Sequence, residues 1–236
     1  HGQFLHNLDH RNRLKSKDLL LVDSGAESIE KYASDITRTY PVDGRFTDIQ
    51  REVYEIVLAA QQIAIESIRP GVPYLDVHLA AAVTLAEGLK SLGLIKGDPS
   101  RAVSAGAHAL FFPHGIGHML GLDVHDMENL GEDRVGYDNT VKRSEQFGFS
   151  SLRLAKPLKP GHVVTVEPGI YFIPKLIDQW KSEKRLSRFI NYPEVEKYKK
   201  LGGIRIEDNV LVTKTGRRVL GKPIPKSMAD IEALMA

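Results

Sequence analysis

Residues 18–23 read Asp-Leu-Leu-Leu-Val-Asp, a short apolar run that closes on an aspartate and is followed by a turn-prone Ser-Gly pair. An apolar run of this length before a turn predicts a buried β-strand. Residues 32–40 form the next predicted strand, and the alternation of its side chains places Asp35 on one face. Together the two strands predict a hairpin on which Asp23 and Asp35 face each other.

Beyond this hairpin the chain carries helical patterns and then further strands. Thr47 and Gln50 have the spacing of a capping box, and the apolar stripe after them predicts a helix of about five turns. Residues 74–92 predict a second helix that stops at Gly93. Further predicted elements are a short helix over residues 102–110, a loop followed by a strand over 114–125, a strand over 161–172, a helical insert over 177–200, strands around 204–207, and a C-terminal helix. No internal repeat is present, so we expect a single α+β domain over residues 1–236.

Composition excludes several classes of function. The chain has 236 residues, with 32 basic and 30 acidic residues scattered along it, which gives no support for nucleic acid or membrane partners. Cysteine is absent, which excludes disulfides, thiolate nucleophiles and thiolate metal sites. Any metal must therefore bind His, Asp or Glu. No apolar run approaches a membrane span and no signal pattern opens the chain, so we expect a soluble, cytoplasmic protein.

Three predicted strands each carry an acidic residue in an apolar setting, namely Asp23, Glu167 and Glu207. Strands usually exclude such residues. A single one of them could point to solvent from a half-exposed strand. Several carboxylates in one interior would cost several kcal/mol per ion unless cations bind them. With Asp35 the set has four carboxylates, whose charge two divalent cations would balance.

A histidine cluster supplies candidate nitrogen ligands. His114, His118 and His125 lie within twelve positions among glycines, and residues 114–118 read His-Gly-Ile-Gly-His. A lone histidine is usually a structural residue, whereas this cluster favours a site. The helical zinc-protease motif is not met, because no Glu follows His114 and the glycines disfavour a helix.

Four strings together resemble the prolidase and aminopeptidase P branch of the M24 "pita-bread" metallopeptidases. They are YASDITRT at 32–39, HGIGHMLGLDVHD at 114–126, TVEPGIY at 165–171 and GIRIED at 203–208. The resemblance runs from about residue 6 to the C-terminus, and it implies a curved, mainly antiparallel sheet flanked by helices. It also implies a dinuclear centre in which Asp35 and Glu207 touch both metals. The implied ligands are Asp23, Asp35, His118, Glu167 and Glu207.

The resemblance further implies a reaction, which is the hydrolysis of Xaa-Pro bonds by a hydroxide that bridges two divalent metals. Ligands that are mostly oxygen suit Mn²⁺, with Co²⁺, Fe²⁺ or Zn²⁺ as alternatives. Glu167 is expected to move protons, and His114 and His125 to bind or polarise the substrate. Arg205 shares a strand face with Glu207, so we expect it to hold the bridging carboxylates; the alternative is a surface arginine on an edge strand.

Two residues bear on the substrate. The segment around Arg153 resembles the prolidase pattern whose arginine binds the free carboxylate of a dipeptide, while the alternative is a solvated charge beside Lys156 and Lys159. His6 resembles the family's proline-pocket histidine, and a flexible terminal histidine is the alternative. We therefore predict a preference for Xaa-Pro dipeptides. The first alternative is an aminopeptidase P that acts on longer proline-containing peptides, and the second is an inactive peptide-binding module on the same fold.

Two departures from the family pattern stand out. The hairpin that joins Asp23 to Asp35 is one residue longer than usual, and a register slip there would turn one aspartate away from the site. The chain also begins without the elements and the preceding domain that the resemblance implies, so we expect an N-terminally incomplete catalytic domain. The full-length protein is expected to be a homodimer.

Overall fold

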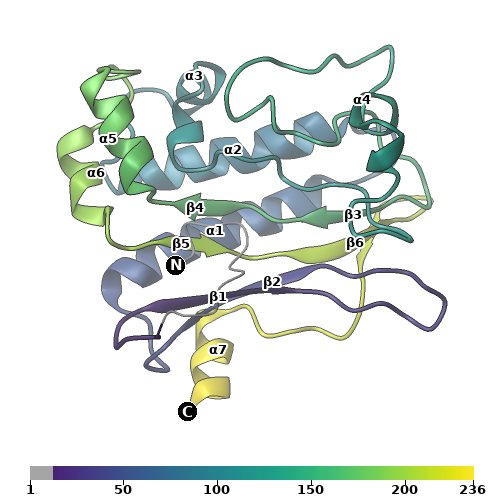
Figure 1. Ribbon diagram of the computed structural model, residues 1–236, viewed down its shortest axis with the longest axis horizontal. Helices are drawn as coiled ribbons and strands as arrows, with labels where there is room; N and C mark the ends of the chain where they lie inside the picture. Colours follow the sequence, from purple (N-terminus) through teal and green to yellow (C-terminus); the bar gives the residue numbers. More distant parts are fainter. Residues whose placement is uncertain (1–12) are drawn as a thin grey trace.

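The computed structural model describes residues 13–236, and Figure 1 shows their strands as a layer with two long helices packed against it. Strands β1 (Leu19–Ser24) and β2 (Ile36–Pro41) form the antiparallel hairpin that the sequence predicts. The prediction of a buried first strand is wrong, because only Leu19 of β1 is buried. Asp23 stands opposite Thr37 and not, as predicted, opposite Asp35. Because side chains alternate between faces, Asp35 lies on the same face as Asp23 and Thr37.

The longer hairpin causes no register slip. The isolated bridge between Glu27 and Ala33 continues the same register that pairs Ser24 with Ile36. The turn between residues 27 and 33 therefore absorbs the additional residue. The second strand is nevertheless shorter than predicted, since it begins at Ile36 rather than near residue 32.

The later strands pair across the chain. β3 (Val163–Val166) pairs with β6 (Asp208–Val212), which also pairs with β7 (Arg217–Val219), and β4 (Gly169–Tyr171) pairs with β5 (Gly203–Arg205). All these pairs are antiparallel. Two of the predicted strand regions are thus interrupted. The strand over 161–172 is broken at Glu167-Pro168, and the strand region around 204–207 is broken at Ile206-Glu207. Proline cannot donate to a ladder, so the first break follows from the sequence.

Helices α1 (Asp48–Ser67) and α2 (Tyr74–Ser91) agree with the prediction. The capping box of Thr47 and Gln50 is present at the start of α1. Gly93 has φ +74° just beyond α2, as a helix stop requires. The two helices pack closely, because a Cβ at Gly88 would meet the Ile56 side chain at 2.5 Å.

Two predicted elements differ in the structure. The helix expected over residues 102–110 is divided into α3 (Pro99–Ser104) and the 3₁₀ turn η1 (Ala107–Leu110), because Gly106 has φ +84° between them. The strand expected within residues 114–125 is wrong as a regular element. Residues 116–120 instead run beside β3, where Thr165 donates to the His118 carbonyl at 3.0 Å and Leu120 to that of Val163 at 3.0 Å.

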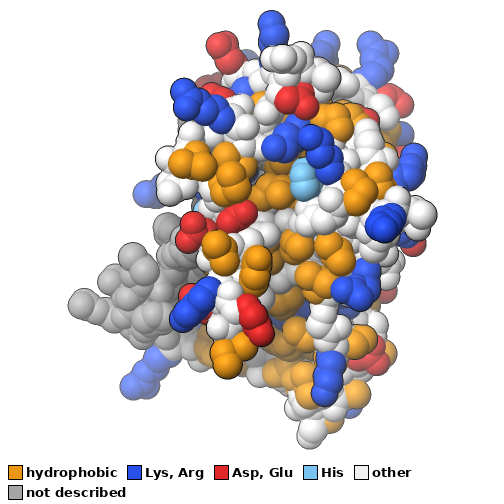
Figure 2. Space-filling model, turned by 90° about the vertical axis from the view of Figure 1, so that its right-hand side faces the viewer, with side chains coloured by type: hydrophobic (Ala, Val, Ile, Leu, Met, Phe, Trp, Pro, Cys, Tyr) orange, Lys and Arg blue, Asp and Glu red, His pale blue; other side chains and the backbone are white. Residues whose placement is uncertain are grey.

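The remaining helices lie at the periphery. They are η2 (Glu128–Leu130), α4 (Glu132–Val135), α5 (Pro174–Ser182), α6 (Tyr192–Tyr198) and α7 (Met228–Met235). Helices α5 and α6 occupy the predicted helical insert. Among residues 13–236, no helix combines the length and the apolar character needed to cross a bilayer. On the face in Figure 2, hydrophobic side chains gather along the middle, and charges of both signs are spread around them.

Candidate metal centre

A cavity of about 430 Å³ opens where the β1–β2 hairpin meets the breaks in the later strands. It collects every predicted site residue that the structure describes. His6 lies outside the described residues. The predicted residues that line the cavity are Asp23, Asp35, His114, His118, His125, Arg153, Glu167, Arg205 and Glu207.

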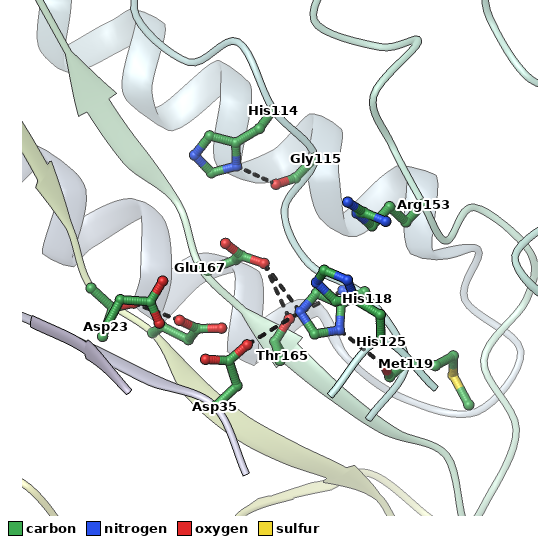
Figure 3. A network of polar contacts seen from close by, with 12 residues as sticks. Asp23, Asp35, His114, Gly115, His118, Met119, His125, Arg153, Thr165 and Glu167 are labelled. Carbon is green, nitrogen blue, oxygen red and sulfur yellow. Dashed lines mark hydrogen bonds and ion pairs between the residues drawn. The ribbon is translucent and has the colours of Figure 1, made fainter. Parts of the chain in front are cut away.

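At the centre of this cavity, Asp35, His118 and Glu207 each offer a ligand atom, and these atoms lie within 4.8 Å of one another. The Nε2 of His118 is 3.5 Å from Asp35 Oδ2 and 3.7 Å from Glu167 Oε1 (Figure 3). Its Nδ1 donates to the Met119 carbonyl oxygen at 2.9 Å. That hydrogen bond fixes the ring and turns Nε2 toward the carboxylates, as expected of a metal-binding histidine.

Arg205 is buried and connects the centre to its surroundings. Its Nη2 donates to Asp23 Oδ2 at 2.6 Å and its Nε donates to Thr37 Oγ1 at 3.1 Å. Thr37 Oγ1 in turn donates to Glu207 Oε2 at 2.6 Å. The guanidinium therefore contacts Asp23 directly and reaches Glu207 through a hydroxyl.

The carboxylates experience opposing influences. Burial, followed by repulsion from Glu167 and Asp35, raises the pKa of Glu207 well above its usual range. Burial also raises the pKa of Glu167, although His118 and Arg205 oppose the shift. For Asp35, burial raises the pKa, but hydrogen bonds with His118 and Asp23 together outweigh this effect, so that the net shift is downward.

The donor set fits divalent cations. Among the described residues, Glu207 Oε1 is buried without a hydrogen-bond partner. A buried polar atom without a partner costs about 1–3 kcal/mol, and more when it is charged, unless another ligand satisfies it. Asp23, Asp35, Glu167 and Glu207 together bring four carboxylates to one cavity. Cations at their centre would satisfy the buried oxygen and relieve the repulsion.

Comparison with known proteins agrees with this geometry. Residues 1–214 match the sequence model of the family described as metallopeptidase family M24. The chain belongs to the M24 metallopeptidases. The α+β pita-bread fold that the sequence predicts is confirmed.

Several relatives of this M24 chain carry specific names. It is 43% identical over 212 residues to the "Probable Xaa-Pro aminopeptidase pepP" of Botryotinia fuckeliana, a match that covers 90% of this chain and 44% of the relative. It is 40% identical over 223 residues to the Xaa-Pro dipeptidase of Rattus norvegicus, covering 94% and 44%. The structure of zinc-substituted E. coli aminopeptidase P in complex with product superposes with a TM-score of 0.76 at 37% identity, covering 99% and 44%. The M24 chain thus spans less than half the length of the relatives it matches.

Two histidines of the M24 chain line the cavity beside the ligand cluster. The Nδ1 of His114 donates to the Gly115 carbonyl oxygen at 2.8 Å, and its Nε2 accepts from the Tyr171 hydroxyl at 2.9 Å. Burial, with a smaller contribution from Arg205, lowers the pKa of His114 to about 3, so the ring is neutral. His125 is more exposed, and its ring lies 4.3 Å from that of His118 between centroids.

Tyr171 and Thr37 are site residues that the sequence reasoning missed. The Tyr171 hydroxyl accepts from Arg205 Nη1 at 2.9 Å and so links Arg205 to His114. Uncharged side chains in predicted strands are typical of a core, and nothing in their residue type indicates a site. The available signal was position, because both residues lie inside the quoted motif strings.

Arg153 lines the cavity from the opposite side, in the loop after η2 and α4. Its Nη1 forms an ion pair with Glu128 and another with Glu132 at 3.1 Å. The arginine is therefore engaged by the first carboxylates of η2 and α4, rather than being a solvated charge beside the lysines that follow it. A substrate carboxylate would have to share or replace these contacts.

Proposed function

We propose that this M24 chain provides the dinuclear metal centre of a peptidase that hydrolyses Xaa-Pro bonds, with dipeptides as its preferred substrates. The observation that carries the proposal is the buried cluster of Asp35, His118 and Glu207, with an oxygen of Glu207 left unpartnered among the described residues. Asp23 and Glu167 would complete the ligand set from the same cavity. Because the relatives are more than twice as long, the activity is proposed for the whole protein.

Two divalent ions bound here would polarise the scissile carbonyl and acidify a water molecule. The chain's own residues supply the other requirements. The proline nitrogen of the scissile bond needs a proton as it leaves, so that it departs as a neutral amine rather than as an amide anion. Glu167 is the group we assign to this transfer, because its carboxylate lines the cavity within 3.7 Å of His118 Nε2 and a carboxyl group can take up and release a proton.

The histidines would position the substrate. His114 is neutral and held by hydrogen bonds at both ring nitrogens, which makes it a rigid wall of the cavity. His125 lies next to His118 with part of its ring exposed. We assign to this exposed imidazole a contact with the substrate near the scissile carbonyl.

Substrate length would depend on Arg153. Its guanidinium can form two parallel hydrogen bonds with the carboxylate of a dipeptide, which supports dipeptidase activity. The ion pairs with Glu128 and Glu132 favour a second candidate function, aminopeptidase P activity on longer peptides, because they neutralise the arginine in advance. The relatives carry both names.

Finer parts of the proposal concern the metal, the assembly and the location. Mn²⁺ is our choice, because four of the five ligands offer oxygen. A homodimer is proposed from the family resemblance. A cytoplasmic location without nucleic acid or membrane partners is proposed from the composition of the sequence.

Metal analysis combined with activity on Gly-Pro and Gly-Pro-Pro tests the proposal. We expect two Mn²⁺ ions per chain and cleavage of the dipeptide. Cleavage of the tripeptide alone would favour aminopeptidase P. Absence of bound metal, together with no cleavage of either peptide after manganese addition, would contradict the proposed function.

A further inference from the structure

Asp35 lies just before β2, at a position where the backbone N–H and C=O point away from β1, because hydrogen-bonded positions alternate along an antiparallel pair. Strand pairing begins at Ile36. On the other side of Asp35, the Ser34 N–H donates to the Ala26 carbonyl oxygen at 3.0 Å. Neither of these interactions involves the backbone of Asp35, although a proposed metal ligand needs a fixed backbone.

The side-chain amide of Asn209 meets these outward-facing backbone groups from β6. The Asp35 N–H donates to Asn209 Oδ1 at 3.1 Å, and Asn209 Nδ2 donates to the Asp35 carbonyl oxygen. A primary amide carries the same donor and acceptor as a peptide group. The pair of hydrogen bonds therefore imitates one rung of an antiparallel ladder. Asn209 is only 4% exposed, so water does not readily replace these bonds.

The position of Asn209 gives this contact a consequence for the metal centre. It lies two residues after Glu207, and the Glu207 N–H donates to the Thr37 carbonyl oxygen at 3.0 Å. The segments that lead into β2 and β6 are thus hydrogen-bonded at Asp35 and at Glu207, the two carboxylates whose oxygens approach His118. Because the aspartate side chain is short, displacement of the Asp35 backbone would displace its carboxylate almost equally.

We propose that Asn209 is a positioning residue that fixes the Asp35 carboxylate relative to Glu207 and so sets the affinity of the centre for divalent ions. This inference rests on the proposed function. The role is indirect, because both polar atoms of the amide are bonded to the Asp35 backbone. Partners of metal ligands typically contribute about 10- to 100-fold to metal affinity.

Calorimetric titration of Mn²⁺ into the metal-free chain tests the role. We expect Asn209→Ala to bind Mn²⁺ about 10- to 100-fold more weakly than the unsubstituted chain. Asn209→Ser should show the same loss, and it keeps a small polar side chain in case the alanine variant does not fold. Asn191→Ala is the matched control, because Asn191 Nδ2 also donates to a backbone carbonyl, that of Gly93 at 2.9 Å, outside the cavity lining.

The control variant should bind Mn²⁺ with unchanged affinity, and thermal melts of the metal-free variants will show that each is folded. Folded Asn209 variants with the affinity of the unsubstituted chain would overturn the role of Asn209 and leave the proposed function intact. An unsubstituted chain that binds no Mn²⁺ would overturn both. Steady-state kinetics at saturating Mn²⁺ provide a second readout, in which kcat should recover most of its unsubstituted value.

Discussion

The two sides of the cavity are built differently. The floor consists of residues within strands or directly beside their ends, whereas the rim is the region of loops and short helical turns over residues 121–156. The floor residues are Asp23, Asp35, Glu167, Arg205 and Glu207. Arg205 and Glu207 in the floor are 3% and 1% exposed. In the rim, the side chains of Arg153 and His125 are 39% and 44% exposed.

The hydrogen bonds differ in the same way. Arg205 and Asp23 are 182 residues apart in the sequence, and Thr37 and Glu207 are 170 apart. Arg153 and Glu128 are only 25 apart. The floor therefore forms only when the whole fold closes, while the rim depends on local ion pairs, which are weak when exposed. We infer that chemistry resides in the floor and substrate choice in the rim.

Removal of one floor carboxylate should have the largest effect on activity. Glu207→Gln keeps the shape of the side chain but removes its charge. We expect kcat/KM to fall by more than about 100-fold, because even the partners of metal ligands contribute about 10- to 100-fold. The metal-free variant should melt at or above the temperature of the unsubstituted chain, because Glu167 and Asp35 no longer repel a buried charge.

Differential scanning calorimetry and metal analysis check this combination. The control is Glu27→Gln, which alters an exposed ion pair with Lys31 and should change neither property. Retention of two Mn²⁺ ions and full activity in Glu207→Gln would contradict the comparison between floor and rim.

Removal of the rim arginine should have a smaller and more selective effect. Hydrogen bonds to charged groups contribute about 1.5–3 kcal/mol, so Arg153→Ala should lower kcat/KM for Gly-Pro by roughly 30-fold. Turnover of Gly-Pro-Pro should change much less. Arg143→Ala is the matched control, because Arg143 also pairs with Glu132 but does not line the cavity. Equal losses for both peptides would show that Arg153 does not select substrate length.

A weaker effect on activity is expected at Tyr171, which connects the floor residue Arg205 to His114. Tyr171→Phe removes the hydroxyl that joins Arg205 to His114 and should lower kcat by about 10-fold, since a hydrogen bond from a charged group contributes about 1.5 kcal/mol or more. Its KM should change little, because the ring that packs beside His114 remains. Tyr192→Phe removes a hydroxyl that donates to the Arg185 carbonyl, far along the chain from the site, and should leave kcat unchanged.

The floor was largely predictable from sequence, and its internal contacts were not. Alternation along a strand indicates which face Asp23 and Asp35 share, and charge balance indicates why carboxylates would meet. The partners of these residues follow from the register between distant segments, which a local pattern does not specify. Asn209 illustrates this, because its two hydrogen bonds to Asp35 span 174 residues.

The rim was less predictable still. The glycine-rich segment that leads into it has no helical or strand periodicity, and the strand expected there is not formed. The pairing of Arg153 with Glu128 and Glu132 depends on two short helical turns that carry no amphipathic signal. Sequence identified Arg153 only through resemblance to a motif.

The last prediction concerns the support of the rim and affects stability rather than activity. Phe149 of the rim packs edge-on against the rings of His78 and His108, at 5.4 and 4.9 Å between centroids. Among the described residues, the ring nitrogens of both histidines are buried without hydrogen-bond partners. Burial lowers the pKa of His78 to about 3 and that of His108 to about 4, from an ordinary value of 6.5.

Between pH 6.5 and about 4, the unfolded chain therefore binds protons that the folded chain does not. The free energy of unfolding is therefore unaffected by these histidines above pH 6.5. As the pH falls through this range, it decreases by about 1.4 kcal/mol per pH unit for each histidine. His78→Phe should retain stacking with Phe112 and remove one of the two groups that take up a proton on unfolding. The melting temperature of the metal-free chain should then fall less steeply between pH 7 and about pH 5. An unchanged slope of melting temperature against pH would show that acid destabilises the chain elsewhere, with the floor carboxylates as the next groups to test.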